Sequence, residues 1–169
     1  SMFGTGLGIE IAAKERDIDD EFSGNALVAS GDLSPGEQSL LDRNGDITTV
    51  EVSYAYKVDE LHSVRPAVGY VDRDLDGGAM SQDGVVLSLA HAYNGEHVVW
   101  ANKVSYTDLS GDKTNPIFGD KNGASGFGLA SSVAFPDSVD FLGKWAPVLS
   151  VNYADLDSDI DFNDFGMWT

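Results

Sequence analysis

The chain has 169 residues with 28 acidic and 10 basic side chains, which gives a formal net charge of −18. This balance argues against nucleic-acid binding, because phosphates are held by Lys and Arg. It suits an acidic surface that recruits divalent cations, or a protein from salty surroundings. The absence of cysteine excludes a disulfide framework and thiol chemistry.

The length predicts one domain over residues 1–169. No apolar run approaches the roughly 18 residues of a transmembrane helix. This does not exclude a membrane, because the strands of a transmembrane barrel alternate and are nearly invisible to hydropathy windows. Ser1-Met2 resembles an expression scar before an internal start, so we expect the native chain to be longer at both ends.

Alternation of large and small side chains predicts eight β-strands. One face of each strand carries large apolar or aromatic residues, and the other carries mostly Gly, Ala, Ser and Val. The strands cover residues 3–16, 47–58, 64–71, 85–93, 98–107, 127–135 and 145–157, and a shortened strand covers 165–169. Between the first two, the capping-box spacing of Ser34 and Glu37, with Pro35 at the first helical position, predicts a short helix through Leu41.

The strand at 145–157 shows the pattern most clearly. Its large face begins at Trp145 and ends at Tyr153, eight residues further on. That separation is roughly 21 Å for a strand tilted by about 40°. It is close to the roughly 25 Å apolar band, edged by aromatic residues, of a transmembrane β-barrel. The large face is therefore expected to meet lipid and the small face to line a lumen.

The connections alternate between long ones (17–46, 72–84, 108–125 and 155–164) and shorter ones (59–63, 94–97 and 136–144). Outer-membrane barrels have this asymmetry. We therefore predict an all-β, antiparallel, up-and-down transmembrane-type β-barrel of about eight strands, or a fragment of a larger barrel. The alternative is a soluble barrel or sandwich whose core is the large face. Because the shortened last strand leaves edges unpaired, we expect self-association through those edges or dependence on further strands.

The four strands that lead into the long connections end in related sequences, which begin at Asp17, Asp74, Asp108 and Asp155. Alternation places these carboxylates on the large face, just beyond the aromatic residues. One hypothesis is an outward belt that binds Ca²⁺ or Mg²⁺ among the anionic lipopolysaccharide head groups. The alternative is that the belt is merely solvated.

One acidic connection copies the ligand spacing of a calcium loop through Asp72, Asp74, Asp76 and Asp83. Its flanks are predicted strands rather than helices, so it is not an EF-hand. The alternative is an acidic hairpin loop in which Gly77-Gly78 makes the turn. Calcium is the only cofactor that the sequence indicates.

The sequence carries no catalytic motif: G-x-S-x-G, a metal-type histidine pair and a phosphate loop are all absent. We therefore expect no enzymatic activity. The alternative is an outer-membrane hydrolase that uses His91 with Ser88 or Ser131. The charged residues of the small face are of mixed sign and would tune the passage of solutes or form a salt-bridged plug. They are Glu10, Lys14, Glu51, Lys57, Arg65 and Lys103.

Four stretches carry a resemblance to a known family. They are residues 16–24 (R-D-I-D-D-E-F-S-G), 40–46 (L-L-D-R-N-G-D), 66–77 (P-A-V-G-Y-V-D-R-D-L-D-G) and 157–164 (D-S-D-I-D-F-N-D). Together they resemble an uncharacterised outer-membrane β-barrel family of Gram-negative bacteria, over nearly the whole chain and as the C-terminal part of the barrel. The resemblance implies the fold and the outer-membrane location, and no known activity.

The expected function is a passive porin-like or structural role in the bacterial outer membrane. The expected partners are outer-membrane lipid and lipopolysaccharide, and no nucleic acid. The alternative is a soluble β-barrel that binds an apolar small ligand on the large face and is modulated by calcium.

Overall fold

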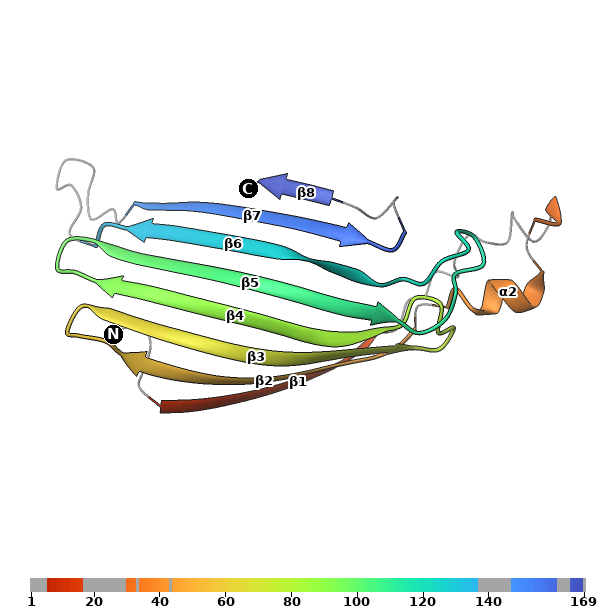
Figure 1. Cartoon of the computed structure of the whole chain (residues 1–169), viewed down its shortest axis with the longest axis horizontal. Helices are drawn as coiled ribbons and strands as arrows, with labels where there is room; N and C mark the ends of the chain where they lie inside the picture. Colours follow the sequence, from red (N-terminus) through yellow and green to blue (C-terminus); the bar gives the residue numbers. More distant parts are fainter. Residues whose placement is uncertain are drawn as a thin grey trace.

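The computed structural model describes residues 6–16, 30–32, 34–42, 44–136, 147–160 and 165–168. These residues form one antiparallel sheet in which each strand pairs with its neighbours in sequence (Figure 1). The strands are β1 (Gly6–Arg16), β2 (Gly45–Lys57), β3 (His62–Leu75), β4 (Gln82–Asn94), β5 (Val99–Gly111), β6 (Ala124–Ala134), β7 (Val148–Ser158) and β8 (Phe165–Trp168). The all-β, up-and-down prediction is confirmed.

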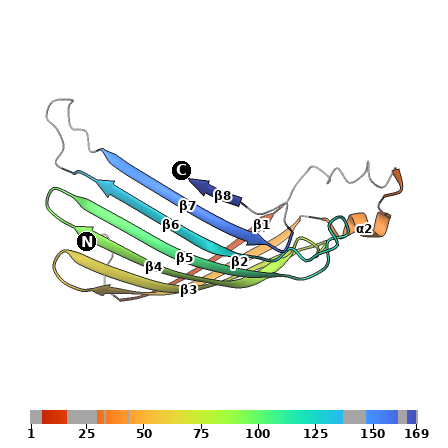
Figure 2. The same ribbon diagram turned by 45° about the horizontal axis from the view of Figure 1, so that its top comes forward.

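The described strands do not close into a complete barrel of eight strands, and the other predicted form, a fragment of a larger barrel, stays a prediction. Among the described residues, β1 pairs only with β2, and β8 pairs only with β7, so the sheet has two open edges. The physical reason is the shortness of β8, whose four residues cannot offer a partner to the eleven of β1. The sheet nevertheless curls into an open trough (Figure 2). The prediction that the edge strands stay unpaired is confirmed.

The register keeps the two predicted faces apart across the whole sheet. Val68 pairs with Val52 and Leu87, and Leu87 pairs in turn with Tyr106, so large residues stand in rows on one face. Pairing between β2 and β3 is interrupted opposite Pro66, because proline has no amide hydrogen to donate. The register is the same on both sides of this gap, so the faces do not exchange.

One face is convex and carries the large residues. They are exposed, from 39% for Val52 to 70% for Ile11. The large exposed residues of this face are Leu7, Ile9, Ile11, Val52, Tyr54, Tyr56, Val68, Tyr70, Val85, Leu87, Leu89, Trp100, Val104, Phe127, Leu129, Leu149 and Val151. None of the other described segments forms a second layer over them, and a contiguous apolar surface of this size marks a site that contacts a membrane or a partner.

The buried apolar side chains lie mainly where the long connections meet. We call this the loop-end core, and it consists of Leu41, Leu75, Ala79, Ser81, Asn115, Asn122, Ala124 and Ile160, each at most 9% exposed. Backbone hydrogen bonds tie its segments together, from Ala79 N to Leu40 O at 3.0 Å and from Asp159 N to Gly123 O at 3.0 Å. Helix α2 (Pro35–Ser39) leads into this core and has the predicted capping box.

In the part of the chain that the structure describes, no helix is long and apolar enough to span a membrane.

The strands extend further toward the long connections than alternation predicted, because cross-strand pairing continues through the aspartates: β3 reaches Leu75 and β5 reaches Gly111. Met167 of β8 pairs with Ala154 and therefore lies on the small-residue face.

Candidate functional site

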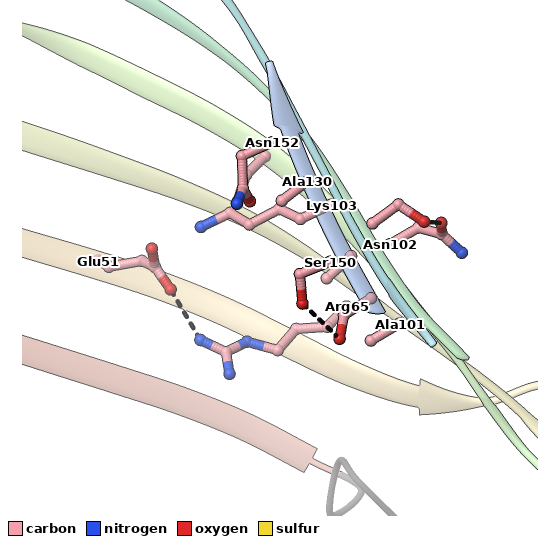
Figure 3. A pocket seen from close by; sticks show the side chains of 12 residues that line it. Glu51, Arg65, Ala101, Asn102, Lys103, Ala130, Ser150 and Asn152 are labelled. Carbon is pink, nitrogen blue, oxygen red and sulfur yellow. Dashed lines mark hydrogen bonds and ion pairs between the residues drawn. The ribbon is translucent and has the colours of Figure 1, made fainter. Parts of the chain in front are cut away.

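A polar hollow occupies the concave face of the sheet. Its volume is about 360 Å³, and side chains from six consecutive strands, β2 to β7, line it. A single hollow can touch six strands only because the sheet curls around it. Figure 3 shows Glu51, Arg65 and Lys103 on this side of the sheet, whereas Asn102 points to the other side.

The floor of the hollow is one row of paired residues: Arg65, Ala90, Lys103, Ala130 and Asn152 stand side by side on successive strands. The long polar side chains alternate with alanines, so they are two strands apart, or about 9.6 Å. The alanines leave the space between them open. The row therefore presents three long polar side chains, and the gaps between them are about as wide as a small solute.

The two cations of this row have different surroundings. The Nη2 atom of Arg65 donates to Oε1 of Glu51 at 2.9 Å, in an ion pair whose side chains are 37% and 26% exposed. Lys103 is exposed and makes no hydrogen bond or ion pair with the other residues that the structure describes. Hydroxyl groups complete the lining, with Ser150 donating to Ser132 at 3.2 Å.

A polar network interrupts the large-residue face near the short connections. Nδ1 of His62 lies 3.0 Å from Nε2 of His91, and the two rings stack with their centroids 5.3 Å apart. Asn102 contacts the other ring nitrogen of His91 at 3.5 Å. Ser131 donates to Oδ1 of Asn102 at 2.9 Å and accepts from Nε1 of Trp100 at 2.9 Å. These polar side chains thus satisfy one another, which an apolar environment requires.

The structure brings His91 into direct contact with neither Ser88 nor Ser131, the two serines of the predicted hydrolase alternative. Ser88 pairs with Ala67 and Ser105 on the concave face, whereas His91 lies on the convex face. Ser131 is separated from His91 by Asn102. Sequence reasoning named His91, Ser88 and Ser131 but could not find the network, because its members come from four strands that only the register brings together.

The predicted calcium ligands lie around the β3–β4 connection. Asp72 and Asp83 are cross-strand partners, Asp74 lies two residues beyond Asp72, and Asp76 follows the end of β3. One oxygen of Asp83 accepts a hydrogen bond from the Tyr70 hydroxyl at 2.9 Å. Among the described residues, no group of three or more His, Asp or Glu side chains is placed to hold a metal ion. Calcium binding stays a prediction.

The aspartates of the predicted belt include Asp17, which lies outside the described residues. Of the other three, Asp108 and Asp155 follow Tyr106 and Tyr153 by two residues on the same face, and on β3 Tyr70 is followed in the same way by Asp72. In β3 the residue in this relation is thus Asp72, and Asp74 lies further out. These three tyrosine–aspartate pairs mark the end of the apolar face on the strands that lead into long connections.

The three pairs descend regularly across the sheet. Val85 pairs with both Tyr70 and Asp108, so Tyr106 lies two residues lower than Tyr70. Leu129 pairs with Val104 and Tyr153, so Tyr153 lies two residues lower than Tyr106. The boundary of the apolar face, which these pairs mark, therefore shifts by one residue from each strand to the next. With about 3.4 Å per residue and about 4.8 Å between strands, the strands are tilted by roughly 35° from the perpendicular to a line through the pairs.

Three glycines face the carbonyl oxygens of the repeated aspartates. A Cβ atom on Gly45, Gly84 or Gly126 would clash with the backbone oxygen of Asp74, Asp108 or Asp155 respectively. Each of these glycines also pairs with the leucine that follows the aspartate, namely Leu75, Leu109 and Leu156. The weak repeat seen in sequence is therefore a repeated structural unit of glycine on one strand and Asp-Leu on its neighbour.

The structure thus defines a curled antiparallel sheet with an apolar outer face and a polar hollow inside. The chain belongs to the family described as Protein of unknown function (DUF2860), whose model matches residues 1–167. No curated protein and no solved structure matches the chain. Membership of an uncharacterised family was predicted and is confirmed, and the outer-membrane origin stays a prediction.

Proposed function

We propose that this chain forms the wall of an outer-membrane β-barrel with a passive, porin-like or structural role and no catalysis. The observation that carries the proposal is the tilted boundary of the apolar face. The roughly 35° inclination of the tyrosine–aspartate line falls at the lower end of the 35–45° tilt of transmembrane barrel strands. A soluble barrel has this tilt too, but it presents a polar outer face to water, whereas here the apolar residues lie exposed on the convex face.

The height of the apolar face supports the same proposal. On β4 it runs from Val85 to Tyr93, which is roughly 22 Å along the membrane normal at this tilt. That is near the roughly 25 Å apolar band of outer-membrane barrels. The curvature also weighs against the soluble alternative, in which an apolar ligand binds inside, because the large residues are on the convex face and the hollow is polar.

A membrane would also explain why the exposed apolar face is bordered by tyrosines and, beyond them, by aspartates. Lipid covers the large residues, the tyrosines lie at its border, and the aspartates beyond them lie at the head-group level. The belt hypothesis adds that a divalent cation bridges these carboxylates to lipopolysaccharide. The unpaired edges of β1 and β8 require partners in lipid, so a second copy or further strands complete the barrel.

Insertion of the chain into liposomes tests the proposal with two neighbouring residues. Leu89 lies at the middle of the apolar face of β4 and is 48% exposed, and Ser88 points into the trough. Leu89→Arg should reduce the inserted fraction strongly, because Arg at the bilayer midplane costs about 2–4 kcal/mol on the lipid face of a barrel. Ser88→Arg, the matched control, should insert like the wild type.

Flotation of the liposomes on a density gradient measures the inserted fraction. The proposal also expects the protein to need detergent in order to stay monodisperse. A wild-type chain that is monodisperse in water and does not float with liposomes would refute the membrane assignment, and so would equal insertion of the two arginine variants.

A further inference from the structure

The concave face is basic although the protein is strongly acidic. Its described charged side chains are Lys14, Lys57, Arg65, Arg73 and Lys103 against Glu10 and Glu51. The chain as a whole has 28 acidic and 10 basic residues. Alternation therefore sorts charge by face: the acidic residues of the strands lie mostly on the convex face near the long connections, and the basic ones lie inside the trough. An excess of basic groups in a trough attracts anions.

Within this face, the hollow gathers one uncommitted cation and several neutral hydrogen-bonding groups. Glu51 already neutralises Arg65 at 2.9 Å, so Lys103 carries the uncompensated charge of the hollow. Ser88, Ser132, Ser150 and Asn152 supply hydroxyl and amide groups around it. A ligand that matches this lining has one negative charge and several hydroxyl groups.

We infer that the hollow is a binding site for small hydroxylated carboxylates, of the sugar-acid class, with Lys103 as the residue that binds the carboxylate. The inference rests on the proposed function, because the hollow must open to water inside a barrel. The ammonium group of Lys103 contacts the carboxylate, and the serine hydroxyls and the Asn152 amide contact the ligand's hydroxyl groups. The alanines at 90 and 130 give the ligand its space on either side of Lys103.

Three six-carbon polyols that differ only at one end test this inference: gluconate is anionic, sorbitol is neutral and glucamine is cationic. Binding to the full chain in detergent is followed by NMR titration. A hydrogen bond to a charged group contributes about 1.5–3 kcal/mol, so gluconate should bind at least about tenfold more tightly than sorbitol. Glucamine should bind more weakly still, because Lys103 repels it.

Two variants assign the effect to Lys103. Lys103→Gln should reduce the affinity for gluconate about tenfold and leave sorbitol binding unchanged, and Lys103→Arg should restore gluconate binding. Lys121→Gln is the matched control, because it removes the same charge from the β5–β6 connection, outside the hollow. Equal affinity for gluconate and glucamine would overturn the inference, as would unchanged gluconate binding in folded Lys103→Gln.

The outcome separates the inference from the proposed function. If the chain inserts into liposomes but discriminates none of the three polyols, the membrane assignment stands and the anion site is wrong. If gluconate binds through Lys103 but the chain does not insert, the site exists and the membrane assignment is wrong.

Discussion

Apolar side chains are buried in the loop-end core and exposed on the convex face. In the loop-end core, Leu41 is 2% exposed and Ile160 is 4% exposed, as in the interior of a soluble domain. On the convex face, Leu87 is 49% exposed and Ile11 is 70% exposed, although both belong to regular paired strands. The chain thus builds a water-excluding core where its connections meet and leaves its strands uncovered. Under the proposed function, lipid supplies the burial that the strands lack.

The largest expected effect comes from truncating the loop-end core. Leu41→Ala should lower the free energy of unfolding by about 2–5 kcal/mol, because a fully buried leucine leaves a cavity. Leu87→Ala, the matched control on the convex face, should cost clearly less in detergent, because the detergent fills the space. Chemical unfolding of both variants in the same detergent measures the difference. Equal losses would remove the distinction between the two regions.

The glycines opposite the repeated aspartates are the next most sensitive positions. Gly84→Ala should lower the free energy of unfolding by about 1–3 kcal/mol, because its Cβ would overlap the backbone oxygen of Asp108. Gly69→Ala is the control: the nearest atom to its Cβ would be the Val50 oxygen at 3.5 Å, an ordinary contact. Thermal unfolding of both variants in detergent provides the measurement. A Gly84→Ala variant as stable as Gly69→Ala would show that the close approach does not exist.

The polar network of the convex face should matter less than packing but more than a surface contact. Ser131→Ala leaves Trp100 Nε1 and Asn102 Oδ1 without their partner, and an unsatisfied group in an apolar environment costs about 1–3 kcal/mol. Ser105→Ala, on the concave face of β5, is the control and should be nearly neutral. Unfolding in detergent compares them. If Ser131→Ala is also neutral, water reaches the network and the face is not lipid-covered there.

The smallest expected effect is a pH dependence at the β2–β3 turn. Backbone hydrogen bonds from Leu61 (2.8 Å) and His62 (2.7 Å) lower the pKa of Asp59 below its ordinary value. A lowered pKa in the folded state means that the carboxylate stabilises the turn above the ordinary aspartate pKa and that this contribution is lost as the pH falls through the lowered pKa. The protection of the Leu61 amide against hydrogen exchange, relative to the intrinsic exchange rate at each pH, should therefore fall in acid. Asp59→Asn should abolish this pH dependence, and a variant that retains it would assign the effect to another group.

Strand order and faces were predictable because alternation is a local property. Each large residue of β4, from Val85 to Tyr93, takes the face that its parity assigned. The open edges also followed from the shortness of β8. By contrast, the hollow itself was not predicted, and Glu51, Arg65 and Lys103 were named only among charges of mixed sign. That Arg65, Lys103 and Asn152 share one row depends on the register between strands, which is set by the whole sheet.

Two further features could not be predicted from local sequence patterns, because they also depend on the register between strands. The His62–His91 contact joins residues 29 positions apart, and the descent of the tyrosine–aspartate pairs is a property of five strands together. The loop-end core was missed because its members come from connections without periodicity. Leu41 was placed at the end of a short helix, and nothing in its neighbourhood indicates that Ala79 and Ile160 are buried in the same region.

The most direct test of the account is the environment of successive residues along β4. Because the chain has no cysteine, single cysteines at positions 85–93 can carry a nitroxide label in liposome-reconstituted protein. Electron paramagnetic resonance then compares relaxation by oxygen, which concentrates in lipid, with relaxation by a water-soluble nickel complex. If lipid covers the convex face, oxygen should dominate at the odd positions, such as 87 and 89, and the nickel complex at the even positions, such as 88 and 90. Labels that meet the nickel complex equally at all nine positions would contradict the account.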